Sequence, residues 1–489
     1  MSGRPAPSPR RIALDALLRI EDGAFAHILL PRTLRSSGLP ARDRALVTDL
    51  VYGTVRMQRR LDVMLSPVSN RAIGSVDAPV RAALRLGAYQ LLIGVPAHAA
   101  VGETVGVVDA RARGFVNGVL RALTRAGPPW PMPDGDDAAA VGVRTSHPDW
   151  IVRTLFDAFG AEDAIATLEL DNEAPPVTLR VNPMRTSTEA LTAEFLAAGA
   201  DVRPGLLVPG SLLLRHAGDL AALPAIADGR ATPQDQSSQA IVAILDPQPG
   251  ELVLDLASAP GGKATAAAER MGGHGLVLAA DLHAGRVRTV LRAAERIGVR
   301  PIVATVVADG RRPPVRDGAF DRVLLDAPCS GLGVLRRRPD ARWRVLPGDV
   351  RDLASLQRVL LSAAAAAVKP GGRLVYAVCT LSKEETVDID EWARTQLPEL
   401  VAEPPPPAPW RPLGRGAILL PSDARTDGMF VLSVTRAAVP TTPRTTSAAF
   451  APETAAAAET AAAEPASLET ASSRAGSRPA GGRHWSPVP

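Results

Sequence analysis

Two cysteines are the residues of this chain best suited to chemistry. The 489 residues include Cys329 and Cys379 and no other cysteine. Each follows a short apolar run, FDRVLLD before Cys329 and GRLVYAV before Cys379, and such runs predict buried strands. The alternative is an inert core cysteine, which would sit equally well inside a helix. A thiolate at the end of a strand is a strong nucleophile, so the pair predicts covalent catalysis.

The neighbours of the thiols narrow the chemistry. Two cysteines are too few for a disulfide scaffold or a cysteine-based zinc site, so no metal is expected. The seven histidines lie in no recognisable protease motif. A thiol beside an acidic residue fits addition to carbon 6 of a pyrimidine, because Asp326 could hydrogen-bond the N3 edge of the ring. Carbon 5 then becomes electron-rich and can attack an electrophilic methyl group.

A glycine-containing turn predicts a ligand site beside the cysteines. In VLDLASAPGGKATAAAER (253–270) a strand ends at Asp255 and a helix begins near Lys263. Glycine allows close approach of the backbone, and a helix N-terminus offers free N–H groups. The turn lacks both GxGxxG and GxxxxGK[ST]. A packing turn remains the alternative.

Two further aspartates favour a nucleoside-like cofactor. Asp281 ends LVLAAD, where a carboxylate can accept the ribose hydroxyls or cap the following helix. Asp309 ends TVVAD and could contact an adenine edge. With Asp255, three consecutive strands end in aspartate on one rim of the predicted sheet, which is better explained by a cofactor than by three independent caps.

The elements that must position these residues change character along the chain. Helical periodicity covers residues 10–127 and ends at the Pro-rich linker GPPWPMPDGDD. Residues 145–235 read as a small α+β unit. Residues 236–436 alternate strands with helices, which predicts a mostly parallel sheet covered by helices. Residues 437–489 are a low-complexity Ala/Thr/Pro/Glu/Ser tail, for which we expect disorder.

Composition and charge indicate a globular protein with a basic first quarter. The hydrophobic fraction is 46% and the charged fraction 22%, and no apolar run is long enough for a signal peptide or a membrane span. A soluble cytoplasmic protein without a membrane partner is expected. Residues 1–140 hold 18 Arg against 12 Asp and Glu, which suits a polyanion. Since 52 of the 55 basic residues are arginine, genomic codon bias or a solvated surface explains them equally well.

The motifs together resemble the Sun/Fmu family of S-adenosylmethionine-dependent RNA cytosine-C5 methyltransferases. The resemblance rests on VLDLASAPGGK, on DAPCSG…RRRPD…W and on the strand that ends at Cys379. RVNPMRTSTEAL resembles the family's small RNA-facing subdomain. RDRALVTDLVYGTVRMQRRLD and GFVNGVLRAL resemble the NusB-like helical domain of the members that act on small-subunit ribosomal RNA. The resemblance covers roughly residues 10–436.

The resemblance implies a multidomain fold. It comprises an all-α NusB-like RNA-binding domain (1–135), a small α+β RNA-binding subdomain (145–235), a Rossmann-like α/β methyltransferase domain (236–436) and the disordered tail (437–489). The NusB-like part would either bind RNA directly or only position the catalytic half. The arginines that could bind RNA there are Arg42, Arg44, Arg56, Arg59 and Arg60.

The family's site roles carry over by position. Cys379 would be the nucleophile, Cys329 would release the product or handle a proton, and Asp326 would stabilise the cytosine edge. Asp281 would take the ribose of S-adenosylmethionine and Asp309 its adenine. Asp326 would also contact the cofactor. The methionine end would be held by the loop of Ala257, Ser258, Ala259, Pro260, Gly261, Gly262 and Lys263.

The chain departs from the family pattern at two places. Ala257 and Ser258 stand where Cys-Ala is usual, which would change packing, and Val378 replaces a threonine before the nucleophile. The expected substrate is a cytosine of small-subunit rRNA, accessible before subunit assembly is complete. The alternatives are a tRNA or another RNA site, and a non-catalytic RNA-binding assembly factor.

Overall fold

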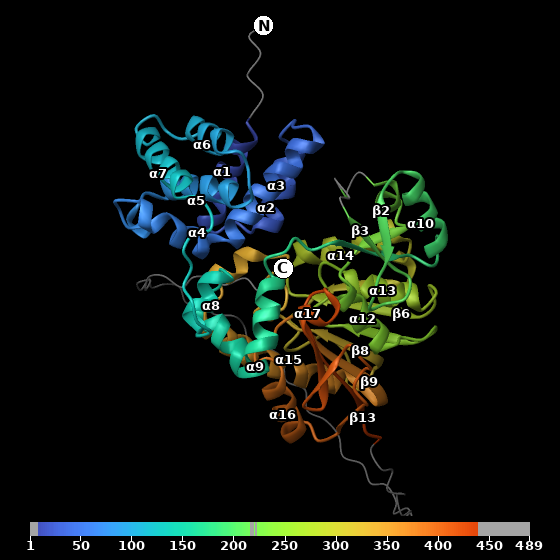
Figure 1. Ribbon diagram of the computed structural model, residues 1–489. Helices are drawn as coiled ribbons and strands as arrows, with labels where there is room; N and C mark the ends of the chain where they lie inside the picture. The colour runs from blue at the N-terminus through green and yellow to red at the C-terminus, as the bar shows by residue number, and fades with distance from the viewer. Residues whose placement is uncertain (1–7, 216–219, 221–222, 439–489) are drawn as a thin grey trace, which may run out of the picture.

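The computed structural model describes residues 8–215, 220 and 223–438. Its first part is a bundle of helices at one end of the molecule (Figure 1). This bundle confirms the helical prediction for residues 10–127, whereas the predicted tail lies outside the described residues except for its first two. The helices are α1 (Pro9–Glu21), α2 (Ala26–Arg35), α3 (Ala41–Arg56), α4 (Gln58–Leu65), α5 (Ala78–Leu92), α6 (Ala97–Gly106) and α7 (Arg113–Ala126).

Amphipathic spacing explains why these helices form a bundle. One face of each contributes to a single apolar core, in which Leu50, Leu84 and Leu120 are fully buried. Gly53 allows α3 to approach α5, because a Cβ there would lie 1.9 Å from the ring of Tyr89. The bundle is therefore a packed domain with its own core.

Two helices after the linker join the bundle to the rest of the chain. They are α8 (Ala138–Arg144) and α9 (Asp149–Leu170), and α9 bends at Gly160, where φ is 80°. The sequence assigns α9 to the small α+β unit, and the packing of its first half adds a contact to that prediction. Ile151 and Leu155 pack into the core of the large sheet, so α9 contacts that sheet directly.

A small antiparallel sheet with two helices follows, at the upper right of Figure 1. Its strand order is β2-β3-β1-β4, and Ser187 caps α10 by accepting from the Ala190 N–H, as the sequence predicted. The elements are β1 (Val177–Val181), α10 (Thr188–Ala197), β2 (Asp201–Pro204), β3 (Ser211–Arg215), α11 (Pro224–Ala227) and β4 (Ala231–Pro233).

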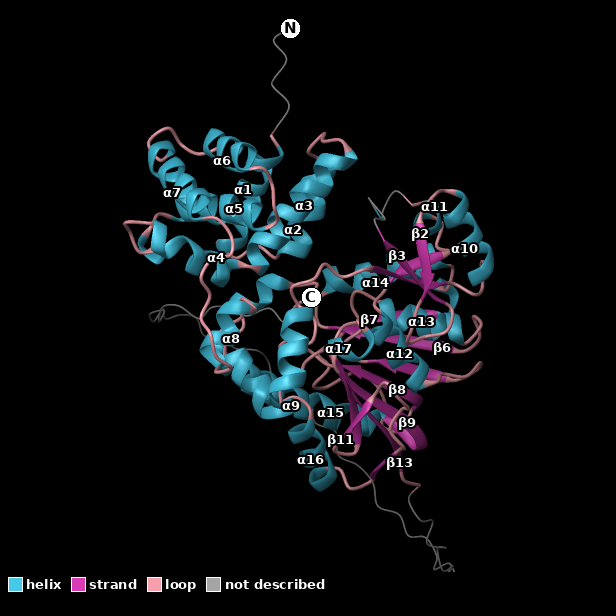
Figure 2. Cartoon of the chain, viewed as in Figure 1, coloured by secondary structure: helices cyan, strands magenta, loops and turns pink. Residues whose placement is uncertain are grey.

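The large sheet has the order β11-β12-β13-β9-β8-β5-β6-β7, and β10 pairs with β13. The five strands from β9 to β7 are parallel and the others are antiparallel. The predicted parallel sheet is thus confirmed for these five strands, which run to the edge strand β7, and it is extended beyond β9 by an antiparallel part (Figure 2). The strands are β5 (Leu252–Asp255), β6 (Leu276–Asp281), β7 (Val303–Val307), β8 (Phe320–Asp326), β9 (Val368–Val378), β10 (Leu400–Ala402), β11 (Arg411–Leu413), β12 (Gly416–Leu419) and β13 (Met429–Arg436).

Helices cover both faces of this sheet. Alternate residues of one strand enter different cores: Val253 packs with α12, α13 and α14, whereas Leu254 packs with α15 and α16. The helices are α12 (Gln236–Leu245), α13 (Gly262–Arg270), α14 (Ala284–Ile297), α15 (Pro347–Ala367), α16 (Val387–Gln396) and the short α17 (Pro421–Ala424). In the part of the chain that the structure covers, no helix is long and apolar enough to cross a membrane.

Candidate active site

The two cysteines meet at the carboxyl edge of the parallel strands. Cys329 lies three residues after β8 and Cys379 directly after β9, and these strands are parallel neighbours with Asp326 opposite Ala377. The sulfur atoms are 3.4 Å apart. Cys329 is buried and Cys379 is half-buried, so Cys379 is the more accessible thiol.

The surroundings make the two thiols unequal. A hydrogen bond from the Cys329 thiol lowers the pKa of Cys379, and the cations of Arg338 and Lys263 add to this against the effect of burial. The same contact and burial raise the pKa of Cys329 well above its usual value. Cys379 is therefore the thiol that ionises first, which suits it to nucleophilic attack.

An ion pair lies beside the thiols. Lys263 Nζ is 2.6 Å from Asp326 Oδ2, although the lysine comes from α13 and the aspartate from β8. Burial opposes the lysine charge, but Asp326 raises the pKa of Lys263 above its usual value. Asp326 Oδ1 has no hydrogen-bond partner among the described residues, and about a third of the side chain is exposed. This oxygen is free to accept from a ligand.

The turn before α13 has the geometry that its glycines predict. Gly261 has φ 101°, and a Cβ there would lie 3.0 Å from the Cα of Val290. Asp255, at the start of the turn, is fully buried, and neither carboxylate oxygen has a partner. The Ser258 hydroxyl is also buried and has no partner at full hydrogen-bond geometry, although it is close enough to Asp255 to oppose the rise of that residue's pKa. Burial and the charge of Asp326 raise the pKa of Asp255 to about 7.

These unpartnered groups test whether the loop fits S-adenosylmethionine. An unpaired buried carboxylate is costly, so its presence indicates a polar or cationic ligand group at this position. The cofactor carries such a group in its methionine ammonium. Asp255 and Ser258 therefore fit the methionine end, and Asp255 adds a residue to the loop that the sequence predicted.

The two other predicted cofactor aspartates differ in their surroundings. Asp281 is buried and accepts from the N–H groups of Ala259 and His283. Arg286 lies 3.3 Å from its carboxylate and donates to the Ala259 carbonyl. Asp281 thus ties the loop to the next strand, and a ribose would share the carboxylate with these donors.

Asp309 lies beyond the end of β7, and its side chain is paired with Arg311. The two residues form several hydrogen bonds, the shortest 2.6 Å long. This pairing lowers the pKa of Asp309 below its usual value. Adenine contact therefore stays a prediction for this residue.

Glu385 is a site residue that the sequence did not reveal. Its carboxylate is fully buried and accepts from the Ser330 N–H at 2.9 Å, the Thr380 hydroxyl at 2.9 Å and the Ser382 hydroxyl at 3.0 Å. Gln357 of α15 donates to it at 3.0 Å. Because Ser330 and Thr380 are the residues after the two cysteines, Glu385 joins both cysteine loops.

The segment after Cys329 also lies against Cys379. The Gly333 N–H donates to the Cys379 carbonyl at 3.0 Å, and its own carbonyl accepts from Gly428 at 2.7 Å. A Cβ on Gly333 would lie 2.3 Å from the Gly428 carbonyl oxygen. Only glycine fits between these two backbones.

Arginines of this segment hold the catalytic half together. Arg337 pairs with Asp427 at 2.9 Å and Asp235 at 2.5 Å. Arg336 donates to the carbonyls of Ala174 and Arg425. Both guanidinium groups are therefore engaged by the protein itself.

The next arginines bind the helical bundle. Arg342 is fully buried and donates to the carbonyls of Arg56, Ser146 and Asp171. Arg344 donates to the carbonyl of Gly23 at 2.8 Å. The bundle is thus docked directly on the segment that follows Cys329.

Two of the arginines that could have bound RNA are instead used in this interface. Arg56 is buried and donates to the Arg336 carbonyl, and Arg59 donates to the His147 carbonyl and to Asp149. Arg56 cannot bind RNA because it is buried inside this interface. These two arginines support the role of the bundle in positioning the catalytic half.

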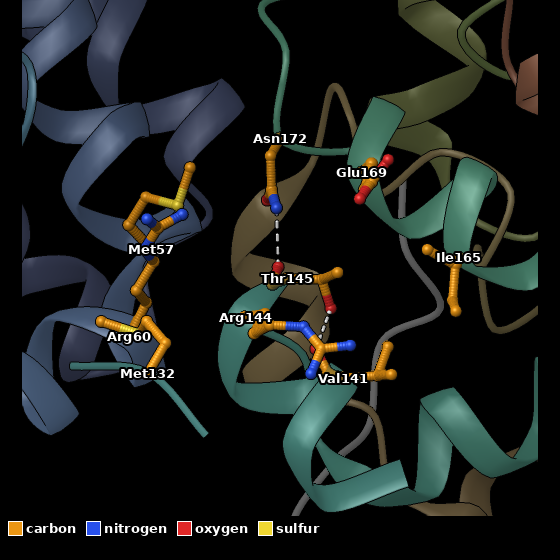
Figure 3. A pocket seen from close by; sticks show the side chains of 9 residues that line it. All are labelled: Met57, Arg60, Met132, Val141, Arg144, Thr145, Ile165, Glu169 and Asn172. Carbon is orange, nitrogen blue, oxygen red and sulfur yellow. Dashed lines mark hydrogen bonds between the residues drawn. The ribbon is translucent and has the colours of Figure 1, made fainter. Parts of the chain in front are cut away.

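A separate pocket of about 340 Å³ lies between α4 and the pair α8 and α9. Figure 3 shows Met57 and Arg60 on one wall and Thr145, Ile165 and Glu169 on the other. Neither cysteine nor any residue of the loop before α13 lines it. The pocket is therefore distinct from the candidate active site.

Comparisons with protein families match three parts of the chain. Residues 242–434 match the family described as 16S rRNA methyltransferase RsmB/F. Residues 7–125 match the NusB family. Residues 147–221 match the ferredoxin-like domain of RsmF/B-like methyltransferases. These matches confirm the resemblance and the expected fold classes.

Similar proteins cover most of the chain. A probable ribosomal RNA small subunit methyltransferase B of Bacillus subtilis is 37% identical over 87% of this chain and 98% of that protein. The ribosomal RNA small subunit methyltransferase B of Pseudomonas putida is 36% identical over 75% of this chain and 86% of that protein.

Solved structures are similar to the chain in fold. The crystal structure of PH0851 is 26% identical, with a TM-score of 0.76 over 89% of this chain and 100% of the other. A methyltransferase homolog of Pyrococcus horikoshii, also 26% identical, has a TM-score of 0.53 over 62% of this chain and all of its own.

Proposed function

The chain belongs to the RsmB/F family of 16S rRNA methyltransferases, and we propose that it methylates carbon 5 of a cytosine in small-subunit rRNA through a covalent bond between Cys379 and the base. As a family member it is an S-adenosylmethionine-dependent rRNA methyltransferase. The observation that supports the covalent route is the pair of sulfur atoms 3.4 Å apart, in which Cys379 has the lowered pKa.

The first step would form a bond between the Cys379 sulfur and carbon 6 of the cytosine. The thiolate supplies the electron pair, and the electrons of the C5–C6 double bond move toward carbon 5. Asp326 would accept from the N4 amino group through Oδ1, because Oδ2 is held by Lys263. Lys263 would in turn place a positive charge near the ring, where negative charge develops.

S-adenosylmethionine supplies an electrophilic methyl group when bound, and carbon 5 is the atom that would take it. Asp255, Ser258 and the N-terminus of α13 would hold the methionine end. Asp281 would contact the ribose and Asp309 the adenine. These assignments place the cofactor along the carboxyl edge of β5, β6 and β7.

The last step would break the sulfur–carbon bond. Carbon 5 loses its proton, the C5–C6 double bond forms again and the Cys379 thiolate leaves. We assign the proton abstraction to Cys329, whose sulfur lies 3.4 Å from that of Cys379: it first gives its own thiol proton to water, then takes the carbon 5 proton as a thiolate and ends as a thiol. Cys329 would thus control release of the product.

Access to Cys379 limits the form of the substrate. The thiol is half-buried at the edge of the sheet, and a base stacked in a duplex cannot reach it. The target cytosine would therefore be unpaired or flipped out. We propose that methylation precedes complete assembly of the subunit, so the naked rRNA should be a better substrate than the assembled subunit.

Covalent trapping tests the roles of the two thiols. The Cys329→Ala and Cys379→Ala proteins are each incubated with S-adenosylmethionine and small-subunit rRNA, then run on a denaturing gel. Cys329→Ala should accumulate a protein–RNA adduct because release is blocked, and Cys379→Ala should give neither adduct nor product. An adduct with Cys379→Ala would reverse the two assignments.

A further inference from the structure

One arginine of the segment after Cys329 is left without a partner. Five arginines lie between positions 336 and 344, and four of them donate to carbonyls or carboxylates of the protein, as described above. Arg338 is the exception: among the described residues its guanidinium has neither a hydrogen bond nor an ion pair. Arg338 is half-buried as a residue, and the five donors of its guanidinium are available to acceptors outside the protein.

The backbone around Arg338 is nevertheless fixed. Its N–H donates to the Val334 carbonyl at 2.9 Å, and its carbonyl accepts from Ala341 at 3.0 Å. The preceding Arg337 is locked by two carboxylates. The unpartnered side chain is therefore carried by a rigid turn.

Arg338 lies on the segment whose Gly333 N–H donates to the Cys379 carbonyl and whose Arg344 donates to the Gly23 carbonyl of the helical bundle. Its charge is close enough to lower the pKa of Cys379. From the bundle side, burial and the cations of Arg338 and Arg344 lower the pKa of His27 to about 4. His27 is thus neutral at neutral pH, and no hydrogen bond joins its ring to Arg338 among the described residues.

Two carboxylates lie near Arg338 and have other partners. Asp340 accepts from the Ala26 N–H at the start of α2 and pairs with Arg344. Asp427 pairs with Arg337. Asp340 Oδ1 is buried and has no hydrogen-bond partner, but no hydrogen bond or ion pair joins it to Arg338 among the described residues, so the guanidinium donors stay available to a ligand.

We propose that Arg338 binds a backbone phosphate of the RNA next to the target nucleotide and thereby holds the base over Cys379. This inference rests on the proposed function and adds a substrate-binding residue to it. A planar guanidinium matches a phosphate with two parallel hydrogen bonds. Its place beside the thiol makes the contact local to the flipped nucleotide.

The test compares variants that remove one positive charge at different places. Arg338→Gln removes the proposed contact, and Arg338→Lys keeps the charge without the fork. Arg394→Gln on α16 is the matched control, because Arg394 is exposed and pairs only with Glu391. Since no hydrogen bond or ion pair joins the Arg338 side chain to another described residue, its variants should fold like the wild type.

Binding is measured on small-subunit rRNA fragments at several salt concentrations, without S-adenosylmethionine. We expect Arg338→Gln to weaken binding about tenfold, the loss of one charge-assisted contact. The slope of log affinity against log salt should fall by about 1. Arg338→Lys should restore the slope but not all of the affinity, and Arg394→Gln should match the wild type.

An unchanged salt slope and unchanged affinity in Arg338→Gln would overturn the inference. So would an equal loss in Arg394→Gln, because the effect would then be general electrostatics. Failure of the proposed function has a different signature: wild-type protein would bind the rRNA without transferring a methyl group. The binding assay is therefore independent of the methylation assay.

Discussion

Replacing Glu385 with alanine should disable the active site although Glu385 touches neither substrate nor cofactor in the proposed mechanism. Its carboxylate joins the loop of Cys329 to the loop of Cys379 through Ser330 and Thr380. Removing it releases both loops together. We therefore expect losses of both stability and catalytic rate.

The contacts allow the stability loss to be estimated. In Glu385→Ala the Ser330 and Thr380 hydroxyls, 2.7 Å apart, still pair with each other, and Gln357 still donates to the Pro328 carbonyl. The Ser330 N–H and the Ser382 hydroxyl lose their acceptor. At about 1–3 kcal/mol for each unsatisfied buried group, the free energy of unfolding should fall by about 2–6 kcal/mol.

Two further variants show whether the loss comes from the hydrogen bonds of Glu385. One removes only its charge, and the other removes a neighbouring carboxylate at the surface. Glu385→Gln can turn its amide nitrogen toward the hydroxyls, which can reverse to accept, so it should cost about 1 kcal/mol. Glu384→Ala is the control, because Glu384 is the exposed neighbour and should match the wild type.

The assay is urea unfolding together with methyl transfer to rRNA below the unfolding transition. A displacement of the cysteine loops by about 1 Å should lower kcat about 100-fold in Glu385→Ala, while S-adenosylmethionine binding is kept because the loop before α13 is untouched. Wild-type kcat in a destabilised but folded Glu385→Ala protein would refute the positioning role.

Three other substitutions test the surroundings of single residues. Gly333→Ala should lower kcat at least tenfold, because its Cβ would meet the Gly428 carbonyl. Gly348 has open space around it, so Gly348→Ala should keep the wild-type kcat. Equal kcat values for the two variants would contradict this prediction. Burial raises the pKa of Asp171 to about 7, so the free energy of unfolding should fall as the pH rises from about 4 through about 7 and the buried carboxyl ionises. Urea unfolding at pH 5 and pH 8 should show this fall in the wild type and not in Asp171→Asn. An equal fall in both proteins would disprove it. Asp255→Asn should weaken S-adenosylmethionine binding about tenfold by calorimetry, and unchanged affinity would show that the carboxylate faces no ligand.

The sequence was sufficient where the signal is local. The runs before Cys329 and Cys379 predicted strands, and parallel neighbours must end at one edge, which is why the two thiols meet. The turn at Gly261 was likewise readable from its glycines. Such features can be predicted from a few consecutive residues, together with the rule that neighbouring parallel strands end at the same edge of the sheet.

The sequence was insufficient where partners are distant. Glu385 follows Cys379 closely, but its acceptor role depends on Ser330 and Gln357, which are 55 and 28 residues away. Asp309 has the same pattern as Asp281, yet a local arginine occupies it. Buried networks and side-chain pairing are decided by packing, which no spacing rule reports.

The structure also bears on what the helical bundle does. A basic composition suggested direct RNA contact by several arginines, but Arg56 and Arg59 are used to dock the bundle on the catalytic half. The trio Arg342, Trp343 and Arg344 completes that interface from the other side. The bundle therefore acts on the active site through the segment that follows Cys329.

The most direct test of the account is transfer of a labelled methyl group from S-adenosylmethionine to protein-free small-subunit rRNA, with the product mapped by bisulfite sequencing. Assembled small subunits, tRNA and the Cys379→Ala protein serve as comparisons. The account predicts one protected cytosine in the free rRNA, less product in assembled subunits, and none with tRNA or with Cys379→Ala. Methylation of tRNA alone, or undiminished transfer by Cys379→Ala, would contradict it.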